Sequence, residues 1–83
     1  MNKAKFRREI SKESNKSILN RIQVHTESSK ELEQTMFELH EAGRQISKTL
    51  IDEQNDLITK IEICQEELKR REILKDIDDE KTM

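Results

Sequence analysis

Two histidines and one cysteine are the side chains of this sequence best suited to bind a metal or to attack a substrate. His25 and His40 stand fifteen residues apart, and neither has a second histidine or a cysteine at the spacing of metal ligands. Cys64 has no histidine near it in the sequence, so we expect a buried thiol that packs like a small apolar group. These residues therefore predict no metal, no cofactor and no nucleophilic catalysis.

Eighteen acidic residues raise the question of acid and base catalysis. A catalytic pair of carboxyl groups needs a concave, desolvated pocket that separates its two pKa values. The chain has 83 residues, of which 31% are hydrophobic and 41% are charged, so it has little material for a core of its own. We therefore expect a protein that is not an enzyme and that gains order by association.

A third chemical role is hydrogen bonding inside an apolar contact. Glu53 and Gln54 interrupt a row of apolar residues. A polar side chain in such a row costs stability, but it fixes the register when a partner helix supplies a matching group. We predict that Gln54, or Glu53 in the alternative frame, forms a polar central layer between helices. The competing explanation is that these polar residues have no role and only mark a shift in the heptad register.

The row around these two residues follows a heptad repeat. From Ile18 to Leu57, steps of four and three residues select twelve positions, and eight of them are apolar. A period of 3.5 residues places such a row on one side of a helix and favours a supercoil with neighbouring helices. The predicted partner-helix interface consists of Ile18, Ile22, Leu32, Met36, Leu39, Gly43, Ile46, Leu50, Leu57, Ile61, Cys64 and Leu68.

The repeat divides the chain into three segments. Residues 1–17 are polar and basic and predict a flexible arm, in which Phe6 and Ile10 are isolated apolar points. Residues 18–74 predict one continuous heptad-repeat helix, and the acidic residues 75–83 predict a frayed end because negative charge there opposes the helix dipole. The predicted fold is all-α: a single long helix that forms a parallel coiled coil or four-helix bundle with partner chains.

Two features interrupt this pattern. Gly43 lies in the row itself, where glycine costs about 0.8 to 1 kcal/mol relative to alanine. We expect a partner helix to approach closely there; a break between two helices, which gives an antiparallel hairpin, is the alternative. Beyond Leu57 the apolar residues fit a frame one residue later, so we place a change of register at residues 50–57. That frame contains Ile51, Gln54, Ile58, Ile61, Gln65 and Leu68.

The segment from residue 41 to residue 57 resembles the central part of a SNARE motif of the Qb kind, as found in Vti-like and SNAP-type light-chain SNAREs. The resemblance extends over residues 18–70. The matching residues are the small pair Ala42 and Gly43, the apolar Ile46 and Leu50, the acidic residue and glutamine at Glu53 and Gln54, and Leu57.

This resemblance implies a parallel four-helix bundle with other SNAREs, whose assembly draws two membranes together in vesicle docking and fusion. It implies that an arginine of a partner meets Gln54 in the central layer. It also implies a place in the cytoplasm, at the cytosolic face of endomembranes, with partners in a hetero-oligomer. The alternative function is a small coiled-coil subunit of a multi-protein adaptor or tethering complex.

Charge and hydropathy exclude several other classes of partner. The formal net charge is −2, with 16 basic and 18 acidic residues, and only two residues are aromatic, so we expect no binding to nucleic acid. No apolar run approaches the roughly 20 residues of a membrane span, so we expect membrane contact only peripherally or through partners. A single cysteine allows no internal disulfide and suits a reducing compartment.

Overall fold

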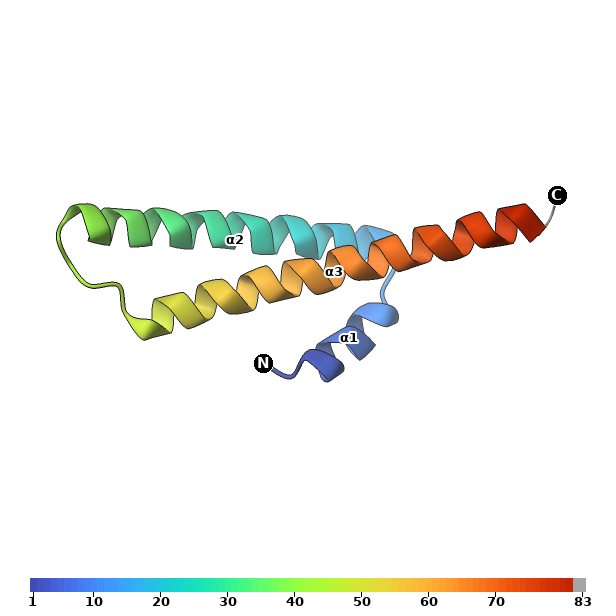
Figure 1. The fold of residues 1–83 in the computed structure, drawn as a ribbon, viewed down its shortest axis with the longest axis horizontal. Helices are drawn as coiled ribbons and strands as arrows, with labels where there is room; N and C mark the ends of the chain where they lie inside the picture. The colour runs from blue at the N-terminus through green and yellow to red at the C-terminus, as the bar shows by residue number, and fades with distance from the viewer. Residues whose placement is uncertain (82–83) are drawn as a thin grey trace.

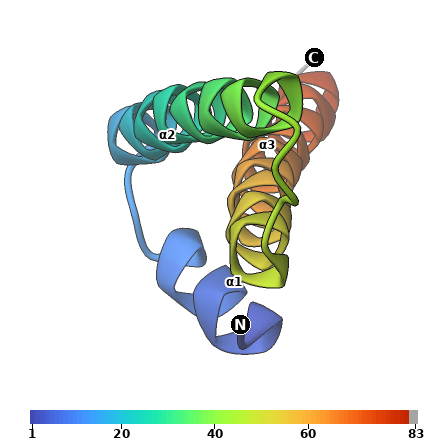
Figure 2. The same ribbon diagram turned by 90° about the vertical axis from the view of Figure 1, so that its left-hand side faces the viewer.

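The protein is a helical hairpin with a short third helix against one side. The computed structural model describes the backbone of residues 1–81 and the side chains of residues 1–72. The helices are α1 (Lys3–Ser11), α2 (Asn15–Glu41) and α3 (Lys48–Lys81). Helices α2 and α3 run antiparallel side by side, and α1 lies against α3 (Figure 1 and Figure 2). The described residues contain no strand, so the all-α prediction is confirmed.

The prediction of one continuous helix over residues 18–74 is wrong, because the chain turns back at Gly43. The φ angle of Gly43 is 71°, in the left-handed region that glycine adopts without steric cost. The N–H of Gly43 donates to the carbonyl of His40 at 3.0 Å, and the N–H of Arg44 donates to the carbonyl of Leu39 at 2.9 Å. This pair of bonds is a Schellman motif, which satisfies the last carbonyls of α2 and ends the helix.

Each of the three helices begins at a polar side chain that accepts a backbone N–H. Such N-caps stabilise a helix start by about 1 kcal/mol. The acceptors are Asn2 for α1, Ser14 for α2 and Ser47 for α3, at 3.1, 3.2 and 3.3 Å respectively. Local backbone chemistry therefore separates the helices, whereas the spacing of apolar residues does not.

The buried apolar side chains gather at the end of the hairpin where all three helices meet. They are Phe6 and Ile10 from α1, Ile18 from α2, and Ile63 and Cys64 from α3, with Ile22 and Leu68 packed against them. Residues 1–17, for which we expected a flexible arm, therefore include a helix that contributes two residues to the core. The acidic segment 75–83 lies beyond the residues whose side chains are described, although the backbone of α3 continues to Lys81.

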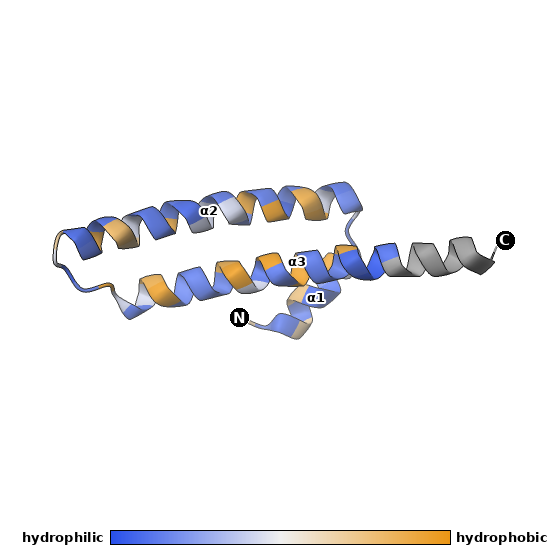
Figure 3. Ribbon diagram, turned by 45° about the horizontal axis from the view of Figure 1, so that its top comes forward, coloured by the Kyte–Doolittle hydropathy of each residue, from blue (hydrophilic) through white to orange (hydrophobic). Residues whose placement is uncertain are grey.

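The half of the hairpin nearer the loop is packed more thinly. Between residues 19 and 62 no apolar side chain is fully buried, and the one buried side chain is polar. Apolar residues are spaced along both helices and do not form a single block (Figure 3). The core at the three-helix end therefore holds the hairpin closed, and the loop half adds less.

Candidate partner-helix interface

Most of the predicted interface residues line the inner sides of the hairpin. Those on α2 are Ile18, Ile22, Leu32, Met36 and Leu39, and those on α3 are Leu50, Leu57, Ile61, Cys64 and Leu68. All ten are buried or half-buried. Because α2 and α3 contact each other along the hairpin, the two inner rows, one on each helix, cover each other within one chain.

The loop contains the other two predicted interface residues. Ile46 is half-buried outside both helices. Gly43 is exposed, and nothing lies within 4 Å of the point where a Cβ would stand. In this conformation Gly43 therefore serves the turn through its backbone, and the close approach of a helix that we expected there is not seen.

The change of register predicted at residues 50–57 falls inside α3, after the loop at residues 42–47. The inner row of α3 has its own frame, which neither sequence frame contains completely: Leu50, Gln54, Leu57, Ile61, Cys64 and Leu68. Ile51, Ile58 and Gln65, which the second sequence frame placed in the row, are exposed. The inner row of α3 departs from the frame of α2 at Gln54, which takes the place that the frame of α2 gives to Glu53.

Gln54 is the polar residue of the inner row on α3. Its side chain is only 7% exposed, and its Oε1 is buried without a hydrogen-bond partner. A buried acceptor left without a donor costs about 1 to 3 kcal/mol. Glu53, the other candidate for a polar layer, is exposed. The inner row of α3 thus contains an acceptor, Oε1 of Gln54, that a donor from a partner helix could satisfy.

No protein-family model, curated protein or solved structure matches this chain. Function is therefore inferred from the interface and its surroundings. Among the side chains that the structure describes, no three His, Cys, Asp or Glu residues come together as metal ligands. None of the described helices is long and apolar enough to cross a membrane.

His25 and Cys64 lie on the inner sides and are held neutral by their surroundings. The Nε2 atom of His25 is buried without a hydrogen-bond partner. Burial lowers the pKa of His25, and the positive charges of Lys60 and Arg21 lower it further. Burial raises the pKa of the Cys64 thiol, although Arg21 opposes that shift. Neither group is therefore prepared for nucleophilic attack in the closed hairpin.

Arg71 ties the three helices together at the end where the core lies. Its guanidinium donates to Oδ1 of Asn15 at 2.6 Å and to the carbonyls of Ile10 and Ser11, both at 3.3 Å. It also donates to Glu67 at 3.0 Å. The first three partners stand 56 to 61 residues away in the sequence, so no local pattern indicated these contacts.

A second arginine fastens the segment between α1 and α2. Arg21 donates to both carboxyl oxygens of Glu13, at 2.6 and 2.8 Å. These hydrogen bonds hold the pKa of Glu13 below its usual value of 4.5. The pair stands eight residues apart and spans the turn before α2, so sequence spacing on a single helix did not indicate it.

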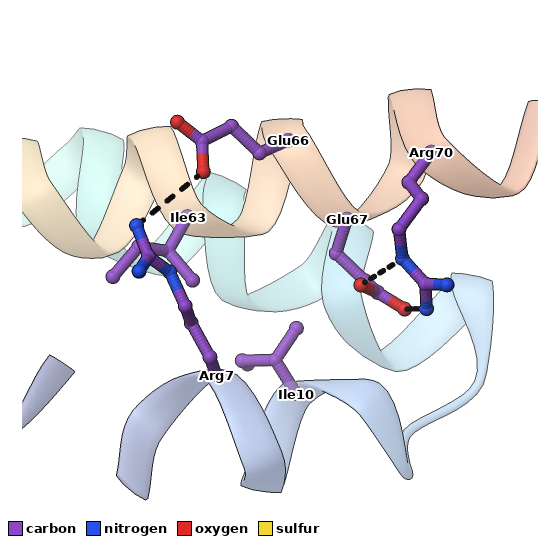
Figure 4. A pocket seen from close by; sticks show the side chains of 6 residues that line it. All are labelled: Arg7, Ile10, Ile63, Glu66, Glu67 and Arg70. Atoms are coloured by element: carbon purple, nitrogen blue, oxygen red, sulfur yellow. Dashed lines mark hydrogen bonds and ion pairs between the residues drawn. The ribbon is translucent and has the colours of Figure 1, made fainter. Parts of the chain in front are cut away.

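The groove between α1 and α3 is an internal contact lined by paired charges (Figure 4). Ile10 and Ile63 point toward each other between the two helices. Arg7 lies 3.7 Å from Glu66 in an exposed ion pair, which contributes little to stability. Arg70 donates to Glu67 at 2.7 and 3.1 Å, and these bonds lower the pKa of Glu67. The groove therefore holds α1 on the hairpin, and its charged side chains pair with one another.

We expect Gln54→Leu to raise the free energy of unfolding by about 1 to 2 kcal/mol, because it removes a buried acceptor that has no donor. Glu53→Leu is the matched control and should change stability by less than about 0.5 kcal/mol, since Glu53 is exposed. Urea unfolding followed by circular dichroism measures both. A loss of stability in Gln54→Leu would mean that Gln54 is hydrogen-bonded in the native hairpin.

We expect stability to fall in two steps as the pH is lowered. The folded state lowers the pKa of His25 from its usual 6.5, so it binds fewer protons than the unfolded state and loses stability below about pH 6.5. Glu13 and Glu67 also have lowered pKa values, so their contribution is lost as the pH falls below 4.5.

Melting temperatures between pH 8 and pH 3 measure both steps. His25→Gln should remove the first step and leave the second, whereas His40→Gln, at an exposed position, should leave both. A wild-type melting temperature that stays constant between pH 7.5 and pH 5 would show that His25 is not desolvated in the fold.

Proposed function

We propose that this chain is a SNARE-like helical protein that assembles with partner SNARE helices in vesicle docking and membrane fusion, without catalysis of its own. The observation that supports this function most is Gln54, which lies buried in an apolar row with an unmet acceptor. In a SNARE bundle an arginine of a partner helix would donate to that oxygen. Because Glu53 is exposed, Gln54 is the residue proposed for the central polar layer.

In this proposal the hairpin is the resting form and must open before assembly. A parallel four-helix bundle needs both inner rows free and a helix that continues through residues 42–47. The loop half of the hairpin contains no fully buried apolar side chain between residues 19 and 62, so opening that half exposes little that was completely buried. On assembly, the inner rows would lose their contacts with each other and become more deeply buried against three partner helices.

Gly43 is the residue whose backbone separates the two forms. In the hairpin it occupies the left-handed region, where a residue with a Cβ costs roughly 1 to 2 kcal/mol. In a continuous helix glycine is about 0.8 to 1 kcal/mol worse than alanine. Both preferences favour the closed hairpin, so the identity of this one residue biases the equilibrium.

A second candidate function is a small coiled-coil subunit of an adaptor or tethering complex that works as a closed hairpin. The Schellman motif at Gly43 and the N-cap at Ser47 favour it, because both are local signals for a stable turn. In this role the inner rows stay covered and partners contact the outer surface. Both functions place the protein at the cytosolic face of endomembranes, with membrane contact through its partners.

We expect Gly43→Ala to strengthen assembly with partner helices by about 20- to 150-fold, since the two backbone preferences add. The substitution destabilises the turn, stabilises a continuous helix and so raises the population that can bind. Its side chain meets no neighbour, so the effect comes from the backbone alone. Titration of Qa-, Qc- and R-type SNARE motif helices, followed by circular dichroism, measures assembly.

Gly43→Asn is the matched control, because asparagine tolerates the left-handed region and is a poor helix former. Its affinity should stay within about threefold of the wild type. No assembly of any of the three chains with these helices would contradict the SNARE function. Capture of tethering-complex subunits that is weakened by Gly43→Ala would then support the closed-hairpin function.

A further inference from the structure

One broad side of the hairpin carries large apolar side chains that the chain itself leaves exposed. Each follows directly after a residue of an inner row, and their exposed fractions range from 41% to 58%. They are Leu19 and Phe37 on α2, and Ile51 and Ile58 on α3. We call the side of the hairpin that holds these four residues the apolar side.

Helix geometry places all four on the same side. One residue turns a helix by about 100°, and an approximate two-fold axis perpendicular to the pair relates two antiparallel helices. The residue that follows an inner-row residue therefore lies on the same side of the hairpin whether it belongs to α2 or to α3. Leu19 and Phe37 are eighteen residues apart, which is about five turns of helix, and Ile51 and Ile58 are seven apart, which is about two turns.

The opposite side of the hairpin is the side against which α1 lies. A residue that directly precedes an inner-row residue lies on this opposite side. Two examples are Arg21, which forms an ion pair with Glu13, and Ile63, which faces Ile10 of α1. Val24 on α2 is an exposed large apolar residue on that side. Helix α1 therefore covers part of one side, and it leaves the apolar side free.

We propose that a second copy of this chain covers the apolar side, so that two hairpins pack face to face as a four-helix bundle. Helix α2 has 27 residues and is about 40 Å long, and a pair of helices is about 20 Å wide. One side of the hairpin thus offers about 800 Å², which is what each partner contributes to a standard protein interface. The thin packing of the loop half is the part of the fold that such a partner would complete.

Charge also favours a second copy over a partner of one strong sign. The half-buried Ser29 and Arg71 continue the inner rows at heptad spacing. By the same one-residue step, three acidic and two basic residues lie on the apolar side: Glu33, Glu62, Glu72, Lys30 and Lys69. Their charges nearly cancel, and the net charge of the whole chain is only −2. Two copies therefore meet with little repulsion, whereas a strongly acidic or basic partner gains little attraction.

The positions of these residues along the hairpin suit an arrangement in which both loops of the dimer lie at the same end. Phe37 stands four residues before the end of α2, and Ile51 stands three after the start of α3, so both are close to the loop. With both loops at the same end, α2 of one copy lies over α3 of the other. Phe37 of each copy then meets Ile51 of the second copy, and Lys30 comes within reach of Glu62 of the second copy.

Sedimentation of the full-length chain, without any partner helix, tests this dimer separately from the SNARE function. We expect the wild type to dimerise at micromolar concentration and Phe37→Ser or Ile51→Ser to weaken the dimer at least tenfold each. Val24→Ser removes a similarly exposed side chain from the other side and should leave the dimer unchanged. All three residues are exposed in the single hairpin, so circular dichroism should show the fold intact.

A wild type that stays monomeric up to about 100 µM would overturn the proposal, as would equal weakening by Val24→Ser. Charge reversal tests the orientation: Lys30→Glu and Glu62→Lys should each weaken the dimer about three- to tenfold, and the double variant should restore it. A double variant as weak as the single ones would overturn the arrangement with both loops at the same end.

Discussion

The left-handed turn at Gly43 decides which surfaces this chain buries. By ending α2 and returning the chain, it brings residues 63–71 of α3 back to the start of the protein. Only this return lets Ile63 and Cys64 complete a core with Phe6 and Ile10, and lets Arg71 reach the end of α1. The core, the polar contacts around it and the covering of the inner rows all depend on the reversal at one glycine.

A small apolar content shapes everything that the reversal builds. With 31% hydrophobic residues, the chain closes a core at one end and leaves the loop half with half-buried rows. That half also contains a buried glutamine whose acceptor is unmet and three of the four residues of the apolar side. These features share one physical cause, since two helices alone enclose too little volume to exclude water from both of their sides. A chain built in this way gains stability from partner helices, whether they replace the hairpin contacts or add to them.

Helical character and most of the inner-row residues could be predicted from the sequence, because both depend on local spacing. The break between α2 and α3 could not be predicted from periodicity, since the loop at residues 42–47 keeps step with the heptads on either side. Gly43, followed four residues later by Ser47, carried the signal for a helix end and a new helix start. To decide whether Glu53 or Gln54 belongs to the inner row, the heptad frame of α3 must be considered by itself. That frame becomes apparent only once the break between α2 and α3 is known. The packing of α1 depends on residues more than fifty positions away, so Phe6 and Ile10 were taken for isolated points.

The size of the chain in solution tests most directly whether it rests as a closed hairpin. Small-angle X-ray scattering, extrapolated to zero concentration, gives the radius of gyration of the single chain. The closed hairpin has a radius of gyration of 17.0 Å, and scattering close to that value is the predicted result. The continuous helix predicted over residues 18–74 would be roughly 85 Å long, with a radius of gyration of at least about 25 Å. A measured value near the larger figure would contradict the hairpin and restore the single helix.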